Sequence, residues 1–150
     1  MVLSAFNEAI PDRGTMRIST AEMSITPTWS PPPLGVFKVN VDGSCHGVDK
    51  SGHIGVDIRD STCRCLAVCR KQICAASVLI AEALGILEGC MTNLRWGYED
   101  VVVESDSRNL ISWLNGNIEQ GNWEVFPILL EFCGAARAFR SCSWAWVPRT

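Results

Sequence analysis

Residues 36–44 read Val-Phe-Lys-Val-Asn-Val-Asp-Gly-Ser, and this stretch constrains the fold more than any other part of the chain. Its apolar and polar residues alternate with a period of two, which is typical of a β-strand. The strand ends in Asp42, and Gly43 and Ser44 follow at once. We therefore expect a strand that delivers a carboxylate to its own C-terminal edge.

The length and composition fit one compact domain. The chain has 150 residues, of which 47% are hydrophobic and 19% charged, as in ordinary globular proteins. The formal net charge is -3 at pH 7, which argues against a protein that holds nucleic acid through a broad basic face. Any polyanionic partner would have to be held by local contacts.

Targeting signals and cysteine usage point to an intracellular protein, in the nucleus or the cytoplasm. No apolar run approaches the roughly 18 residues of a membrane helix, and the first residues lack a signal-peptide pattern. The eight cysteines are therefore interpreted as free thiols, with no disulfide partner. Cys63, Cys65, Cys69 and Cys74 match no paired zinc motif, and we expect them to be buried thiols.

Composition divides the chain into two segments. Residues 1–28 show no sustained periodicity and mix Pro, Ser, Thr, Asp and Gly, which indicates a flexible leader. The sequence Trp-Ser-Pro-Pro-Pro at residues 29–33 then fixes an extended approach to the next element. We expect the folded domain to span residues 29–150.

Periodicity predicts the order β-β-β-α-β-α-α-β. Three alternating segments joined by turns indicate an antiparallel meander, and a later strand with three consecutive valines is expected to pair in parallel. The expected strands cover residues 36–44, 53–59, 65–71, 100–106 and 142–147, and the expected helices cover residues 77–97, 108–114 and 123–139. The predicted fold class is α/β, with a mixed sheet and helices packed on it.

The first helix is expected to bury one apolar stripe. Ser77 is the expected N-cap, and Ser107 the expected cap of the next helix. Helical spacing places the following residues on the stripe: Ile80, Leu84, Leu87, Met91 and Leu94. Glu82 is expected at the flank of this buried face, where its carboxylate can point along the edge of the sheet.

Three acidic residues stand out by position: Asp42, Glu82 and Asp106. If the first and fourth strands are adjacent and parallel, their C-terminal edges bring Asp42 and Asp106 together, with Glu82 above them. Clustered carboxylates repel unless a cation holds them, and hard oxygen ligands suit Mg²⁺ or Mn²⁺. Such a set allows two-metal displacement at a phosphodiester, with the ions ~4 Å apart. A single aspartate at a strand end more often caps a turn, but the joint pattern favours a metal site.

Short motifs surround these carboxylates in a fixed order. They are Lys-Val-Asn-Val-Asp-Gly-Ser at 38–44, Ala-Glu-Ala-Leu at 81–84, Val-Glu-Ser-Asp-Ser at 103–107 and Trp-Val-Pro-Arg at 146–149. With the leading Trp-Ser-Pro-Pro-Pro, they closely resemble the ribonuclease H-like family, in its plant branch of retroelement relatives. The resemblance implies a five-stranded mixed sheet flanked by helices, and metal-dependent endonucleolytic cleavage of the RNA strand of an RNA·DNA hybrid.

The resemblance also implies roles for individual residues. Asp42 would be a catalytic ligand shared by two metal ions, Glu82 a ligand to one of them, and Asp106 a further ligand. The backbone at Gly43 and Ser44 would lie beside the ribose 2′-OH, the group that separates RNA from DNA. These expectations make Mg²⁺ or Mn²⁺ the cofactor and an RNA·DNA hybrid, or another nucleic acid, the partner.

The end of the sequence departs from the family pattern. Family members continue past Val-Pro-Arg to a final helix with a fourth carboxylate, whereas this sequence ends at Thr150. We therefore expect a missing final helix, an uncovered apolar patch and a weakened second metal ion. The alternative is a non-catalytic module, derived from a retroelement ribonuclease H, that binds nucleic acid or a protein.

The remaining polar and aromatic residues have plainer interpretations. Glu104 is expected to lie on the other face from Asp106 and outside the site. A solvated hairpin is the default for the following cations, with a local basic strip for phosphates as the alternative: Arg59, Arg64, Arg70 and Lys71. Packing is favoured over base stacking for Trp113, Trp123, Trp144 and Trp146.

Overall fold

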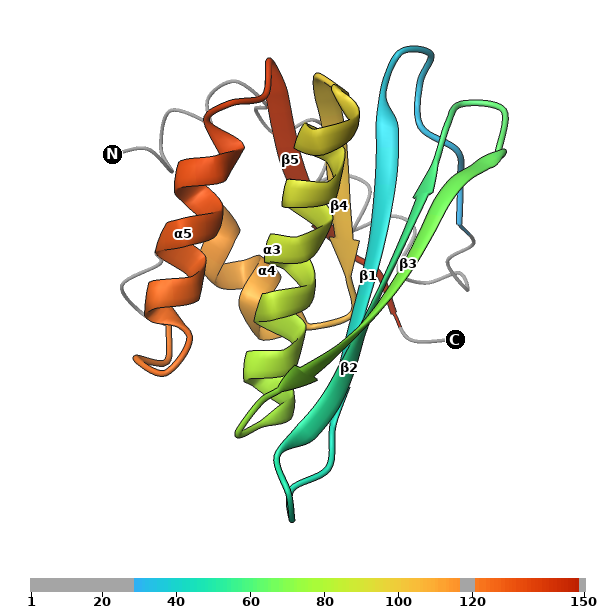
Figure 1. Ribbon diagram of the computed structural model, residues 1–150. Helices are drawn as coiled ribbons and strands as arrows, with labels where there is room; N and C mark the ends of the chain where they lie inside the picture. The colour runs from blue at the N-terminus through green and yellow to red at the C-terminus, as the bar shows by residue number, and fades with distance from the viewer. Residues whose placement is uncertain (1–28, 117–120, 149–150) are drawn as a thin grey trace.

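The computed structural model describes residues 29–116 and 121–148, so the expected leader at residues 1–28 lies outside the described part. The described elements are β1 (Phe37–Cys45), β2 (Ser51–Arg59), β3 (Cys65–Cys74), α3 (Val78–Trp96), β4 (Asp100–Ser105), α4 (Arg108–Asn115), α5 (Phe126–Ala136) and β5 (Ser141–Trp146). Figure 1 shows how they assemble into a sheet with helices packed against it. The predicted order of elements is confirmed.

The five described strands form one mixed sheet in the order β3-β2-β1-β4-β5. Strands β1, β2 and β3 make the predicted antiparallel meander, and β1–β4 and β4–β5 pair in parallel. A parallel pair needs a crossover, and α3 supplies it between β3 and β4. The predicted fold class, a five-stranded mixed sheet with helices, is therefore confirmed.

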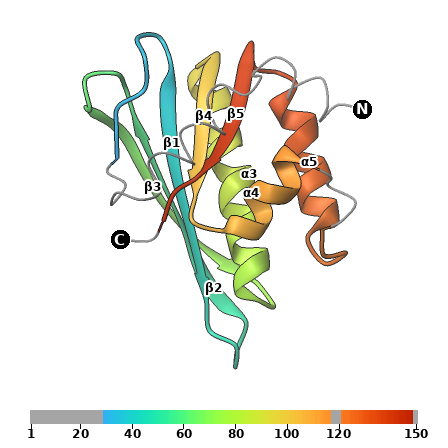
Figure 2. The same ribbon diagram turned by 180° about the vertical axis from the view of Figure 1, so that it is seen from behind.

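One hydrophobic core lies between the sheet and the helices. Its fully buried members come from both layers, for example Val39 and Ile58 from the sheet and Ile86, Leu110 and Phe132 from the helices. Figure 2, seen from behind, shows the strands in front of these helices. Residues that alternate with the core positions point the other way, and we call their side of the sheet the open face.

Helix α3 packs through small residues instead of the predicted stripe. Met91 is 38% exposed, whereas the buried residues are Ala81, Glu82, Ala83, Gly85, Ile86, Gly89, Cys90, Thr92 and Asn93. A Cβ on Gly89 would lie only 2.8 Å from Cγ1 of Val41. Because the helix lies this close to β1, the predicted stripe falls beside the contact: Ile80, Leu87 and Leu94 are half-buried against the core.

Helix ends follow the predicted capping chemistry. The hydroxyl of Ser77 accepts a hydrogen bond from the Ile80 amide at 3.2 Å, and Ser107 accepts one from the Leu110 amide at 3.4 Å. Gly97 ends α3 with a φ of 80°, which glycine adopts without strain. Helix α5 is shorter than predicted, since it begins at Phe126 with a proline in its first turn.

The cysteines are free thiols, but their burial differs from the prediction. Cys65 and Cys74 are exposed and Cys69 is only half-buried because β3 is an edge strand, and Cys63 is exposed in the turn before it. The buried thiols are instead Cys90, Cys133 and Cys142. No helix in the described ranges has the length and apolarity that crossing a bilayer requires.

Candidate active site

Asp42 lies in β1, three residues before the strand ends, and Asp106 directly follows β4, the neighbouring parallel strand. Register partners in the β1–β4 pair run from Phe37 with Val101 to Asn40 with Glu104. Continued by two residues, this register sets Asp106 level with Asp42. Asp42 is exposed and Asp106 is half-buried. The predicted parallel adjacency of the first and fourth strands is therefore confirmed, whereas β1 continues past Asp42 to Cys45 instead of ending there.

Helix α3 brings Glu82 to the same end of β1. A Cβ on Gly43 would lie 2.5 Å from the carbonyl carbon and oxygen of Ala81, and 2.7 Å from the backbone nitrogen of Glu82. Strand and helix backbones thus touch at Gly43, a contact that only glycine allows. Glu82 itself is 8% exposed, so it belongs to the buried face of the helix and not to its flank.

The same contact shows how the residues after Asp42 are placed. The space beside the Cα of Gly43 is filled by the backbone of α3. Ser44 points to the opposite side and is exposed on the open face, as is Asp42. The carboxylate of Asp42 and the hydroxyl of Ser44 are thus accessible from the same side of β1.

The three carboxylates share one end of the sheet without forming a three-ligand site. Among residues 29–116 and 121–148, no three His, Cys, Asp or Glu side chains are arranged to hold a metal ion. Asp42, Glu82 and Asp106 supply only oxygen ligands, which suit a hard cation such as Mg²⁺. The donor chemistry therefore fits the predicted metal, although the three side chains do not meet at one point in this structure.

Glu104 lies on the open face, so the prediction that alternation points it to the other face from Asp106 was wrong. Residues two apart on a strand share a face, so alternation does not separate Glu104 from Asp106. Glu104 is 4% exposed and accepts hydrogen bonds from Trp29 Nε1 at 3.2 Å and Asn40 Nδ2 at 3.1 Å. Its other oxygen lies 3.1 Å from Lys38 Nζ. Burial raises the pKa of Glu104, and Lys38 opposes this shift.

Trp146 contacts both the backbone of Asp106 and the side chain of Arg108, a connection that the sequence did not indicate. Trp146 Nε1 donates to the backbone oxygen of Asp106 at 3.2 Å. The guanidinium of Arg108 lies 4.3 Å from the centre of the Trp146 ring, a cation–π geometry. Trp146 therefore packs at the strand end, as predicted for the tryptophans in general, while Trp123 is 82% exposed and contradicts that prediction.

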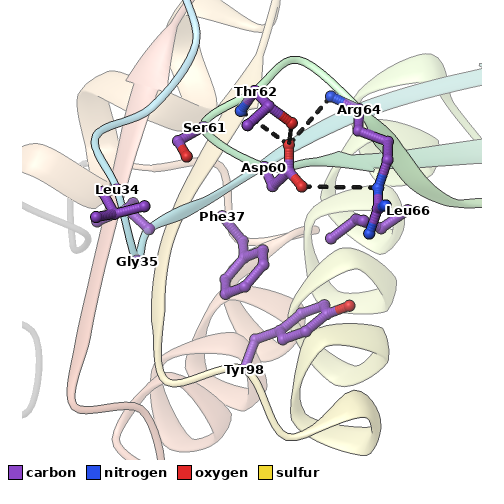
Figure 3. A pocket seen from close by; sticks show the side chains of 10 residues that line it. Leu34, Gly35, Phe37, Asp60, Ser61, Thr62, Arg64, Leu66 and Tyr98 are labelled. Carbon is purple, nitrogen blue, oxygen red and sulfur yellow. Dashed lines mark hydrogen bonds and ion pairs between the residues drawn. The ribbon is translucent and has the colours of Figure 1, made fainter.

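A cavity of about 450 Å³ lies at the other end of β1 (Figure 3). Phe37 and Tyr98 stack beside it with ring centres 3.9 Å apart. The carboxylate of Asp60 at its rim is bound by Thr62 and Arg64 of the same turn. Phe37 precedes Asp42 by five residues, or roughly 17 Å of strand. The cavity is therefore separate from the carboxylate end.

Comparisons with known proteins agree with this architecture. The model of a family described as reverse transcriptase-like matches residues 40–150. A search of curated proteins found no match.

Several solved structures are similar to the chain. An N-terminal RNase H domain from Mycobacterium tuberculosis has a TM-score of 0.69 at 21% identity, over 76% of this chain and 83% of that one. RNase H1 from the archaeon Halobacterium salinarum has a TM-score of 0.69 at 17% identity, over 76% and 86%. LC11-RNase H1 in complex with an RNA/DNA hybrid has a TM-score of 0.68 at 16% identity, over 75% and 86%. At these identities the likeness shows a shared fold.

Proposed function

This chain belongs to the reverse transcriptase-like family, and on that premise we propose that it is a ribonuclease H-type endonuclease. Its proposed reaction is hydrolysis of the RNA strand of an RNA·DNA hybrid. One observation carries the proposal: the β1–β4 register sets Asp42 and Asp106 level, at the point where α3 holds Glu82 against β1. That a structural neighbour was solved with an RNA/DNA hybrid supports the choice of substrate.

The proposed catalytic residues are Asp42, Glu82 and Asp106. The proposed cofactor is Mg²⁺ or Mn²⁺, which when bound would activate water and stabilise the leaving oxygen. Asp42 is exposed on the open face, where a phosphodiester can approach it. The Ser44 hydroxyl, on the same face, and the backbone of Gly43 are the proposed contacts of the ribose 2′-OH. We also propose the plant retroelement branch and an intracellular location.

Cleavage of a labelled RNA·DNA hybrid in Mg²⁺ or Mn²⁺ tests the proposal. We expect the wild type to cut the RNA strand and Asp42→Asn to lose most of this activity. Asp57→Asn is the matched control, since Asp57 also lies on the open face but its carboxylate pairs with Arg59 at 3.3 Å. Equal cleavage by the wild type and Asp42→Asn would remove Asp42 from the site.

Metal binding has a readout that is independent of cleavage. A ligand that binds only the folded state raises the melting temperature. We therefore expect Mg²⁺ to raise the melting temperature of the wild type more than that of Asp42→Asn. An equal shift in both proteins would show that the ion binds elsewhere.

A second candidate function is a non-catalytic module that binds nucleic acid or a protein. It is favoured by one observation: within the described residues, the three carboxylates do not converge into a three-ligand site. This candidate predicts that the wild type binds the hybrid without cutting it, and that a chelator leaves the affinity unchanged. Cleavage that a chelator abolishes would exclude it.

A further inference from the structure

Most of the basic side chains in the described part of the chain are already paired with carboxylates. The described part contains the cations Lys38, Lys50, Arg59, Arg64, Arg70, Lys71, Arg95, Arg108, Arg137 and Arg140. The paired ones are Lys38, Arg59, Arg64, Lys71, Arg95 and Arg140. Internal pairing removes these cations from the set that can bind a polyanion without first losing a partner.

Ion pairs engage three of the four cations that could form a local basic strip on the meander. Arg59 pairs with Asp57, Arg64 with Asp60, and Lys71 with Glu88. Arg70 is exposed and has no carboxylate within ion-pair distance among the described residues. Of the four cations, Arg70 is therefore the one whose guanidinium is available to an external anion.

Strand register places Arg70 in one row with Asp42. Asp42 pairs with Gly55 across β1 and β2, and Gly55 pairs with Arg70 across β2 and β3. Directly opposite residues share a face, so Asp42 and Arg70 both lie on the open face. Two strand spacings separate their backbones, or about 10 Å. A parallel row of exposed polar residues runs beside it: Ser44, His53 and Gln72.

Gly55, in the middle of the row, leaves the surface between Asp42 and Arg70 unobstructed. A Cβ built on Gly55 would meet no atom within 4 Å, so open space lies above it. Any residue other than glycine would place a side chain in this space. The backbone of an extended ligand can therefore lie against the sheet between the carboxylate and the guanidinium.

From this juxtaposition we propose that the row Asp42–Gly55–Arg70 is a track for a nucleic-acid backbone. Arg70 binds a phosphate of the hybrid while Gly55 gives the sugar-phosphate chain room to cross β2 toward Asp42. The inference deepens the proposed function by naming the surface on which the substrate lies. Phosphate contacts fix position and orientation, so Arg70 is a substrate-binding residue and not part of the chemistry.

The first test compares Arg70→Ala with Arg64→Ala. Arg64 is also exposed, in the turn of the same hairpin, but pairs with Asp60 at the other end of the sheet. Fluorescence anisotropy of a labelled RNA·DNA hybrid, without divalent ions and over a series of salt concentrations, gives the affinity. Loss of one phosphate contact should lower the magnitude of the slope of the logarithm of the binding constant against the logarithm of salt concentration by about 0.9. This corresponds to about 8-fold weaker binding at about 0.1 M salt. Arg64→Ala should retain the wild-type slope.

A second variant separates obstruction of the track from loss of folding. Gly55→Val adds a β-branched residue to a strand interior where space is open, so the free energy of unfolding should stay equal or increase. The same valine should weaken hybrid binding, because it stands between Asp42 and Arg70. A rise in stability together with a loss of affinity is not expected of a purely structural position.

The outcomes distinguish this inference from the proposed function. Wild-type affinity and salt slope in Arg70→Ala, or equal losses in Arg70→Ala and Arg64→Ala, would overturn the track while leaving hybrid cleavage intact. Binding that depends on Arg70 without any cleavage by the wild type would support the track and contradict the nuclease. A wild type that does not bind the hybrid would overturn both.

Discussion

The contact between Gly43 and helix α3 predicts the effect of a single methyl group. In Gly43→Ala the new Cβ would lie 2.5 Å from the carbonyl group of Ala81, whereas ordinary contacts begin at 3.4 Å. The obstructing atoms belong to the helix backbone and cannot rotate away. Strand and helix must therefore separate by about 0.9 Å, the difference between these two distances. That shift would also move Glu82 away from Asp42.

Overpacking of this kind costs about 1–3 kcal/mol. We expect Gly43→Ala to lower the free energy of unfolding by about 2 kcal/mol, measured by urea denaturation followed by circular dichroism. With an m-value of about 2 kcal/mol/M, the midpoint would fall by about 1 M. Hybrid cleavage should fall further than the population of folded protein does, because Glu82 is displaced in the folded state.

Two glycine controls test this reasoning. Gly55→Ala in β2 and Gly134→Ala in α5 introduce a Cβ with no atom within 4 Å. Both should leave the free energy of unfolding unchanged or raise it, by up to about 1 kcal/mol for the helix position. Ala81→Gly should not rescue Gly43→Ala, since the clash is with backbone atoms. A midpoint for Gly43→Ala equal to that of Gly55→Ala would refute the close contact.

Two further predictions concern buried groups. Burial raises the pKa of Cys90 to about 12 and that of Cys133 to about 11, so a thiol reagent should label Cys63, Cys65 and Cys74 first. Mass spectrometry can follow the labelling of each cysteine. Labelling of Cys90 or Cys133 in the native protein as fast as in urea would contradict this prediction. Because burial raises the pKa of Glu104 above its unfolded value, the folded state binds this proton more tightly. The unfolding free energy of the wild type relative to Glu104→Gln should therefore rise as the pH is lowered from about 7 toward about 4.3, the ordinary glutamate pKa. A fall would show that the effect of Lys38 on the Glu104 pKa outweighs the effect of burial.

Local signals in the sequence predicted the elements well, and long-range packing accounts for the differences. Alternation located all three meander strands, and hydroxyl residues located the helix starts at Ser77 and Ser107. The buried face of α3 was missed because an apolar periodicity does not register how closely a helix approaches a strand. Gly85 and Gly89 carry that information, but only once β1 is known to lie beneath them.

The site residues show the same division. Strand order placed Asp42 beside Asp106, since both positions follow from the crossover between parallel strands. The pairing of Arg59, Arg64 and Lys71 with carboxylates depends on contacts that the linear sequence does not display. Arg70 therefore differs from its neighbours only after the fold is known.

Two contacts, one on each face of the sheet, set the relative positions of the three carboxylates. Asn40 and Glu104 form the last register pair of β1 and β4, and the Asn40 amide donates to the Glu104 carboxylate at 3.1 Å. Beyond that pair no ladder contact joins the two described strands, and the carboxylates follow two residues later. On the helix face, Gly43 fixes the distance of β1 from α3. Because one contact holds the strands to each other and the other holds the helix, Asn40→Ala should alter the Asp42–Asp106 spacing, whereas Gly43→Ala should alter the position of Glu82.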